Sequence, residues 1–259
     1  LGDIDATGAL VVEAVSGGIS QDGDGAPGAD INAAAVANFT AATTIMLTDA
    51  SNDFAAVVNA DGSAVSINDI NAIELGDIDA ASLAVTAGTT INDGASSMGA
   101  NADIDVTGTT TLSASGAITL DDVRNNFGQA VSADGGAVVL QDVDNIILGD
   151  VLAGGGLTVT AAGAITDSAN SSVTVTGATT LTASDNGAYF DIALDNDTVA
   201  GRHDFGGAVT AIGQDITLID RSGVTLGAIT TNGGAPDDTI NVDGGAEATD
   251  PGELIVIAR

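Results

Sequence analysis

Short runs of alternating apolar and polar residues follow one another along almost the whole chain. In Leu157–Ala161, for example, leucine, valine and alanine alternate with threonine. Gly, Asn and Asp residues separate such runs. Period-two alternation bounded by turn-forming residues is typical of short, half-buried strands joined by tight turns. Because no run shows a convincing helical period, the pattern predicts an all-β chain.

A longer repeat organises these strands. The motif Leu-Gly-Asp-Ile begins at Leu1, recurs at Leu75 and, with valine in the last place, at Leu148, and has a weaker copy at Leu226. Self-similarity at a fixed period is the sequence signature of solenoid architectures. The predicted repeat units of about 75 residues are 1–74, 75–147 and 148–225, followed by a partial unit, 226–259.

A phenylalanine marks the same place in three units. Phe54, Phe127 and Phe205 each follow a pair of polar residues, the last of these pairs beginning with His203. A fixed place in the repeat favours an internal aromatic stack over an exposed stripe for binding sugars. We therefore predict that the three rings occupy equivalent buried positions.

Each unit divides again into three stretches of about 25 residues, a length that suits one coil of a solenoid. One short strand cannot bury its apolar face alone, whereas coils stacked about 4.8 Å apart align Leu, Val and Ile into a continuous core. The pattern predicts that residues 1–259 form a single β-solenoid, a parallel β-helix. A pair of β-sandwich domains is the alternative, but it needs larger core residues and no nested periods.

Composition narrows the classes of function. The chain has 36 acidic and only 4 basic residues, with a formal net charge of -32. Nucleic acids and anionic membrane surfaces would repel such a chain, whereas calcium and other cations would gather around it. The absence of cysteine excludes disulfides, thiolate zinc sites and a cysteine nucleophile. The charge therefore makes nucleic-acid binding unexpected. Membrane insertion is also not expected, since no apolar run approaches about 18 residues.

The repeats resemble those of filamentous-haemagglutinin-like bacterial surface proteins. The resemblance covers nearly the whole chain and is clearest in the stretches 126–142, 148–150, 157–161 and 163–166. It implies a long right-handed β-helical stalk that is secreted to the bacterial cell surface and serves adhesion, aggregation or biofilm structure. A host or matrix glycan or protein is the partner that it implies. That family's export-signal domain is not found here, so we expect a fragment, a processed product or another export route.

Two acidic stretches are the candidate calcium sites. Asp22 and Asp24 resemble the opening of a calcium loop, but no glutamate follows at the twelfth position of that loop. Asp237, Asp238 and Asp243 lie in a glycine-rich stretch similar to the calcium repeats of secreted toxins, although one copy cannot form a stacked site. No cofactor other than calcium is expected.

Aspartates also recur at strand ends throughout the chain. An aligned column of carboxylates could collect calcium, but aspartate is also a good turn residue because its side chain accepts hydrogen bonds from nearby main-chain amides. We favour the turn role. The recurring positions are Asp69, Asp93, Asp142, Asp167 and Asp220.

Two other functions are alternatives. A polysaccharide-active β-helix enzyme would need a site that breaks the repeat symmetry, and no aspartate cluster does so. His203 is the only histidine, and we expect it to be an exposed loop residue because no partner for acid–base chemistry recurs around it. An ice-binding solenoid is suggested by the threonine runs at Thr109, Thr158 and Thr174, but these are not expected to share one column.

The predicted function is therefore that of a non-catalytic, extracellular structural or adhesive protein that stacks end to end. The stacking partner would be the rest of its own polypeptide or a second copy. The terminal run Leu254, Ile255, Val256 and Ile257 is strongly hydrophobic and β-prone, and we expect it to pair with a neighbouring edge. A head-to-tail contact of this kind would propagate as a filament.

Overall fold

Side chains of the strands alternate between a buried and an outer face. In β18 (Leu157–Ala161) the side chains of Leu157, Val159 and Ala161 are at most 1% exposed, and the threonines between them are half-buried. The computed structural model describes residues 1–21, 30–94, 103–196, 203–231, 240–244 and 253–256, the last two stretches by their backbone alone. Within these residues all regular structure is β-strand, as predicted. None of this part of the chain forms a helix that could cross a membrane.

The chain forms two units, Leu1–Gln129 and Ala130–Arg259, and each is described by itself. The strands of the first unit are β1 (Ile4–Ala6), β2 (Leu10–Ala14), β3 (Ile19–Ser20), β4 (Ile31–Ala33), β5 (Ala37–Ala41), β6 (Thr44–Leu47), β7 (Asp53–Phe54), β8 (Val58–Asp69), β9 (Ile73–Ala87), β10 (Ile91–Asp93), β11 (Ile104–Val106), β12 (Thr110–Ala114), β13 (Ile118–Leu120) and β14 (Asn126–Phe127). Those of the second unit are β15 (Val131–Gly135), β16 (Val138–Asp142), β17 (Ile146–Ala153), β18, β19 (Ile165–Asp167), β20 (Val173–Val175), β21 (Thr179–Asp185), β22 (Ala188–Tyr189), β23 (Ile192–Leu194), β24 (Asp204–Phe205), β25 (Ala208–Gly213), β26 (Ile216–Asp220), β27 (Thr225–Thr231), β28 (Ile240–Gly244) and β29 (Glu253–Val256).

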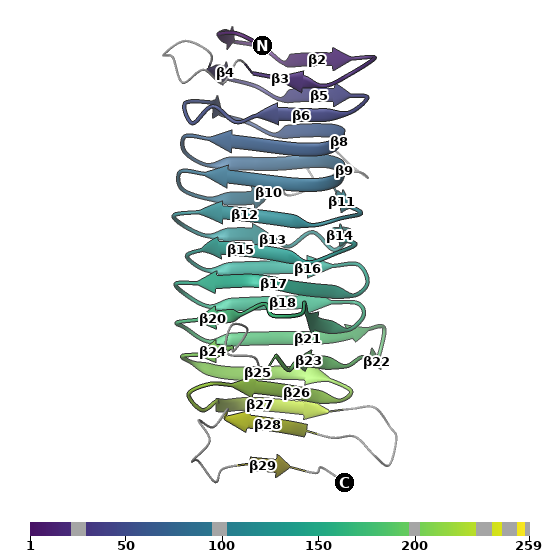
Figure 1. Cartoon of the computed structure of the whole chain (residues 1–259), viewed down its shortest axis with the longest axis vertical. Coiled ribbons are helices and arrows are strands. Elements are labelled where there is room, and N and C mark those ends of the chain that lie inside the picture. Colours follow the sequence, from purple (N-terminus) through teal and green to yellow (C-terminus); the bar gives the residue numbers. More distant parts are fainter. Residues whose placement is uncertain (22–29, 95–102, 197–202, 232–239, 245–252, 257–259) are drawn as a thin grey trace. The chain divides into compact units, whose positions relative to one another are not determined.

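Three columns of parallel strands make up the start of the first unit (Figure 1). One column contains β1, β4 and β7, the second contains β2, β5 and the first part of β8, and the third contains β3, β6 and the rest of β8. Each strand pairs with the strand one coil further along the chain, so successive coils hydrogen-bond to one another. This arrangement confirms the predicted parallel β-solenoid. The right-handedness of its coils stays a prediction.

The coils have unequal lengths around the expected 25 residues. Hydrogen bonds between adjacent coils join Asp5 to Asn32, 27 residues apart, Asn38 to Asn59, 21 apart, and Asn59 to Asp77, 18 apart. In the second unit the separations include 22 residues and 30 residues. Loops between the strands carry most of the differences in length, and register shifts at Val58/Ala60, Val131/Ala133 and Val209/Ala211 carry the rest.

The repeat does not restart in the column where it began. Leu10, Ala37, Val58 and Leu75 stand opposite one another in successive coils, and Leu75 opens the second repeat. The counterpart of Leu10 in that repeat is Leu83, which stacks in the next column on Val65. In the second unit Leu157, Thr179, Val209 and Leu226 form the same series. Each repeat therefore begins one column further round the coil.

The burial predicted for the three marker phenylalanines is confirmed, but the predicted equivalence is not: Phe54 stands in the column of β1, β4 and β7, whereas Phe127 stands on β11 in the column that begins with β2. Phe54 and Phe127 are 1% exposed and Phe205 is 2% exposed, and each is the inward residue of a two-residue strand. The Phe39 ring meets the Phe54 ring edge to face, with centroids 6.1 Å apart. These rings belong to the core and leave no aromatic stripe on the surface at this position.

Candidate functional site

A fully buried polar side chain precedes the marker phenylalanine by two residues in each repeat. Asn52, Asn125 and His203 are all 0% exposed. Each side chain accepts a hydrogen bond from the main-chain N–H of the first residue of a strand in the preceding coil. These donors are Ile31, Ile104 and Val173, at 2.9, 3.1 and 2.9 Å. The position thus satisfies a main-chain group that would otherwise be buried without a partner.

The same side chains also bond to a polar residue at or just beyond the end of a strand. Asn52 Nδ2 donates to Gln21 Oε1 at 2.9 Å, and Asn125 Nδ2 donates to Asp93 Oδ2 at 2.7 Å. His203 Nε2 lies 2.8 Å from Asp167 Oδ2. Because Nδ1 of His203 accepts the N–H of Val173, the ring proton is on Nε2 and is donated to Asp167. Each repeat thus contains one two-sided polar corner, made by Asn52, Asn125 or His203.

The prediction that His203 is an exposed loop residue is wrong. Both of its ring nitrogens have partners, and its main-chain oxygen accepts the N–H of Arg221 at 3.0 Å. The corner needs a side chain with one acceptor and one donor, and a neutral imidazole offers both, as asparagine does. The signal was in the sequence, because His203 stands two residues before Phe205 as Asn52 and Asn125 stand before theirs. No ring nitrogen is left for a substrate.

The turn role favoured for the strand-end aspartates is confirmed. Asp69 Oδ2 accepts the N–H of Phe54 at 2.8 Å, and its Oδ1 accepts that of Asn71 at 2.7 Å. Asp220 makes the same two kinds of bond in the third repeat, with Phe205 at 2.6 Å and Ser222 at 2.7 Å, and Asp142 Oδ1 accepts the N–H of Asp144 at 2.8 Å. Burial raises the pKa of Asp69, although these hydrogen bonds act against the rise.

Asp93 and Asp167 have a similar structural role at the polar corners. Asp93 Oδ2 accepts the N–H of Asp122 at 2.9 Å, and burial raises the pKa of Asp93. Asp167 Oδ2 accepts the N–H of Asn196 at 3.2 Å in addition to its bond with His203. The strand-end carboxylates, which could have formed an aligned column for calcium, therefore accept hydrogen bonds from main-chain amides.

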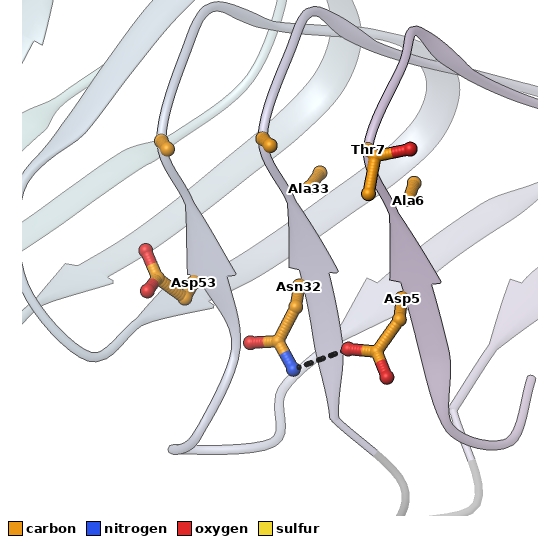
Figure 2. A pocket seen from close by; sticks show the side chains of 8 residues that line it. Asp5, Ala6, Thr7, Asn32, Ala33 and Asp53 are labelled. Atoms are coloured by element: carbon orange, nitrogen blue, oxygen red, sulfur yellow. Dashed lines mark hydrogen bonds between the residues drawn. The ribbon is translucent and has the colours of Figure 1, made fainter.

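An open hollow of about 210 Å³ lies over β1, β4 and β7. Figure 2 shows Asp5, Asn32 and Asp53 in a row across these strands, with Ala6 and Ala33 beside them. Asn32 Nδ2 donates to Asp5 Oδ1 at 3.0 Å, so an amide separates the two carboxylates. The hollow exposes a row of hydrogen-bond acceptors, whose chemistry suits hydroxyl donors or cations.

A denser row of carboxylates runs from the end of the first repeat into the second on the outer face of the strands. Asp61, Asp79 and Asp105 stand opposite one another in successive coils. Asp77 and Asp103 lie beside them, and burial together with the nearby Asp103 raises the pKa of Asp77. Burial, Asp79 and Asp103 raise the pKa of Asp105. Burial is the main cause of these raised pKa values, and repulsion between neighbouring carboxylates adds to it.

The arginines that the structure describes form local pairs with aspartates. Arg124 Nη2 lies 3.1 Å from Asp122 Oδ2, and this contact lowers the pKa of Asp122. Arg221 Nη2 lies 2.7 Å from Asp204 Oδ2. Arg202 falls outside the described residues. Each pair joins residues within one turn or between adjacent coils.

The candidate calcium ligands receive little structural description. Asp22, Asp24, Asp237 and Asp238 lie outside the described residues, and Asp243 is placed only by its backbone, in β28 opposite Ile219. Among the side chains that the structure describes, no group of three or more His, Cys, Asp or Glu residues is placed to hold a metal ion. Calcium binding at these five positions stays a prediction.

Threonines form a small array that sequence reasoning missed. The runs at Thr158 and Thr174 belong to different columns, as expected. However, Thr158 stands opposite Thr180, and Thr180 stands opposite Thr210, on β18, β21 and β25. Two residues along the same strands, Thr160 stands opposite Thr182, which stands opposite Ile212. The threonine array therefore ends within three coils. This extent is small for an ice-binding face.

The terminal hydrophobic run pairs within its own chain. β29 pairs antiparallel with β28, placing Leu254 opposite Val242, Ile255 opposite Asn241 and Val256 opposite Ile240. Ile257 lies outside the described residues. The expected pairing of this run with a neighbouring molecule stays a prediction, and one edge of β29 is already used by β28.

The repeats are also recognised by comparison with known families. Residues 1–61, 62–134 and 135–212 each match a family described as repeats of unknown function (DUF5649). Its second and third repeats begin at 62 and 135, whereas the Leu-Gly motif places the boundaries at 75 and 148 with the same spacing. No curated protein and no solved structure matches the chain significantly. Because the three matches span well over half of its length, the chain belongs to this repeat family.

Proposed function

We propose that the chain is a non-catalytic structural and adhesive segment of a secreted bacterial surface protein, as its resemblance to filamentous-haemagglutinin-like repeats implies. The observation that carries the proposal is the polar corner. Asn52, Asn125 and His203 occupy one repeat position, and all three bond to the main chain of a neighbouring coil. Such a position builds the scaffold in every repeat, whereas an active site would occur once.

The environment of the acid–base groups supports a role without catalysis. His203 is 0% exposed and its ring nitrogens are both engaged. Asp69 and Asp220 accept main-chain N–H groups in the same way in different repeats. A general base must reach the proton that it removes, and these groups cannot reach a ligand in solvent.

One edge of the first unit supports axial stacking. Within the described residues β1, β2 and β3 have strand partners on one side only, namely β4, β5 and β6. The inward residues of β1 and β2 are half-buried, whereas the residues opposite them in the next coil are buried. The first set includes Ile4, Leu10 and Val12, and the second includes Ile31, Ala37 and Phe39. An open edge with exposed apolar side chains favours pairing with another β-edge.

A matched pair of substitutions in β2 tests this stacking. Val12→Lys places a charge on the inward face of the open edge, where it should block pairing. Val11→Lys adds the same charge on the outer face, where Val11 is 71% exposed, and should leave pairing intact. We expect the wild type and Val11→Lys to form elongated assemblies by light scattering and electron microscopy. Val12→Lys should remain monomeric, with its fold checked by circular dichroism.

A wild-type chain that stays a monodisperse monomer at all concentrations would exclude end-to-end assembly. Equal assembly of the two folded variants would show that β2 is not the contact. Turnover of neutral or acidic polysaccharides by the purified chain would contradict the non-catalytic part of the proposal.

A further inference from the structure

The third repeat contains a hairpin that the second repeat lacks. Ile118 and Ile192 occupy equivalent positions in their repeats. Each stands opposite an isoleucine that is the first residue of the paired strand in the preceding coil. Between Ala114 and Ile118 the second repeat has three residues, Ser115–Ala117. The third repeat has Ser184–Asp191 at this place. This insertion is one of the places where the length of the third repeat departs from that of the second.

The inserted hairpin has a defined conformation. Ser184 pairs antiparallel with Tyr189, and Asp185 pairs with Ala188. The two loop residues, Asn186 and Gly187, both have positive φ, at 46° and 87°, which is the geometry of a type I′ turn. At the base of the hairpin, Phe190 N donates to Ala183 O at 3.0 Å, and Phe190 O accepts the N–H of Gln214 at 2.7 Å. These bonds join the base of the hairpin to β21 and to the next coil.

The hairpin also carries the aromatic side chains that reach the surface. The sequence contains 5 phenylalanines, 1 tyrosine and no tryptophan. Phe39, Phe54, Phe127 and Phe205 are buried, at 1–2% exposure. Tyr189 and Phe190 are half-buried, and Asp185, Asn186 and Asp191 of the same hairpin are exposed. Aromatic side chains that reach the surface on a segment with exposed hydrogen-bonding groups have the composition of a small recognition site.

We propose that the hairpin Ser184–Asp191 is a contact site for a neutral saccharide. This inference rests on the adhesive role proposed above. Aromatic rings offer apolar faces to the C–H groups of a sugar, and the carboxylates accept hydrogen bonds from its hydroxyl groups. Acidic side chains around the rings and the net charge of -32 disfavour anionic glycans. A protein partner would require about 800 Å² of surface, far more than one two-residue-loop hairpin provides.

Two variants and a conservative control test the site. The first is Tyr189→Ala, and the second replaces Ser184–Asp191 with the Ser-Gly-Ala link of the second repeat. The shorter link is compatible with the fold, because Ala117 O accepts the N–H of Ile91 at 3.1 Å just as Asp191 O accepts that of Ile165 at 3.0 Å. Tyr189→Phe is the control, since it keeps the ring.

Binding of each folded chain to an array of immobilised neutral and acidic glycans is the measurement. We expect the wild type and Tyr189→Phe to bind neutral glycans, and the other two variants to bind at least about tenfold more weakly, the equivalent of 1.4 kcal/mol. No binding by the wild type, preference for acidic glycans, or undiminished binding by the link variant would overturn the proposal. Binding of the chain to an immobilised protein that carries no glycan, without binding to any glycan, would also overturn the proposal. Assembly of the link variant, followed by light scattering, separates failure of this site from failure of the structural role.

Discussion

The second and third repeats form the same hydrogen bonds at the polar corner with different residues. At the polar corner the second repeat uses Asn125 with Asp93, and the third uses His203 with Asp167. Donor and acceptor distances are closely similar, at 2.7 and 2.8 Å to the aspartate. The corner therefore constrains the hydrogen-bonding capacity of the side chain and tolerates a change of residue type. A buried N–H that needs an acceptor sets this constraint.

On the outer face, equivalent positions of the same two repeats differ in their interactions. After the Leu-Gly motif the second repeat places Asp77 beside Asp103, and the two carboxylates repel. In the third repeat Asp150 Oδ1 instead accepts the N–H of Ser172 at 2.9 Å and its hydroxyl at 3.4 Å. Solvent screens the repulsion between exposed charges, so an unfavourable pair is tolerated there. We therefore expect the interior corner to contribute more to stability than the acidic surface does.

The largest expected effect comes from emptying the corner. His203→Ala leaves the Val173 N–H and the Asp167 carboxylate without this partner inside the protein, and we expect a loss of about 3 kcal/mol in the free energy of unfolding. His203→Asn restores one donor and one acceptor and should recover most of the loss, as Asn125 shows that asparagine suits the site. Chemical denaturation followed by circular dichroism measures both values.

Asn125→Ala is the matched control in the first unit. It should be destabilising for the same reason, by about 2 kcal/mol, since it leaves the Ile104 N–H unsatisfied. Equal stability of the His203→Ala and His203→Asn proteins would show that hydrogen bonding does not determine the corner.

A smaller gain is expected from removing a buried hydroxyl. Within the described residues Thr110 and Thr179 are at most 1% exposed, and their hydroxyl groups have no hydrogen-bond partner. The first repeat has Ala37 at the same register position. Thr179→Val replaces the hydroxyl with a methyl group, and we expect it to raise the free energy of unfolding by about 1 kcal/mol. A loss of stability in urea denaturation would mean that the hydroxyl is satisfied in solution.

The smallest effect concerns the acidic face and depends on pH. Asp103→Ser copies the third repeat into the second and should stabilise the protein at neutral pH by about 0.5 kcal/mol, since like charges across strands are destabilising. The pKa of Asp77 is raised in the folded state, so the wild type gains stability as the pH falls through that raised value. The advantage of Asp103→Ser should therefore disappear near about pH 4. Denaturation curves at both pH values give the comparison, and an advantage that grows in acid would contradict it.

The interior of this fold follows from the sequence more directly than its surface does. Alternation in runs such as Leu157–Ala161, together with the recurring Leu-Gly motif, was enough to predict parallel coils and buried phenylalanines. His203 was misjudged because it was assessed as a possible base and not as the third member of a series with Asn52 and Asn125. The hairpin at Tyr189 was missed because an insertion of a few residues leaves the period almost unchanged. Surface rows such as Thr158, Thr180 and Thr210 depend on coil lengths, which loops alter.

The shift of one column per repeat limits what duplication of the repeat can build. With three columns in a coil, a new repeat faces about a third of a turn away from its predecessor within the same unit. Thus the acidic row around Asp5 and that around Asp79 lie in different columns. Copying a repeat therefore distributes its surface groups around the circumference and does not extend a flat face. A surface group that arises in one repeat therefore has its own orientation, and its copy in the next repeat points in another direction.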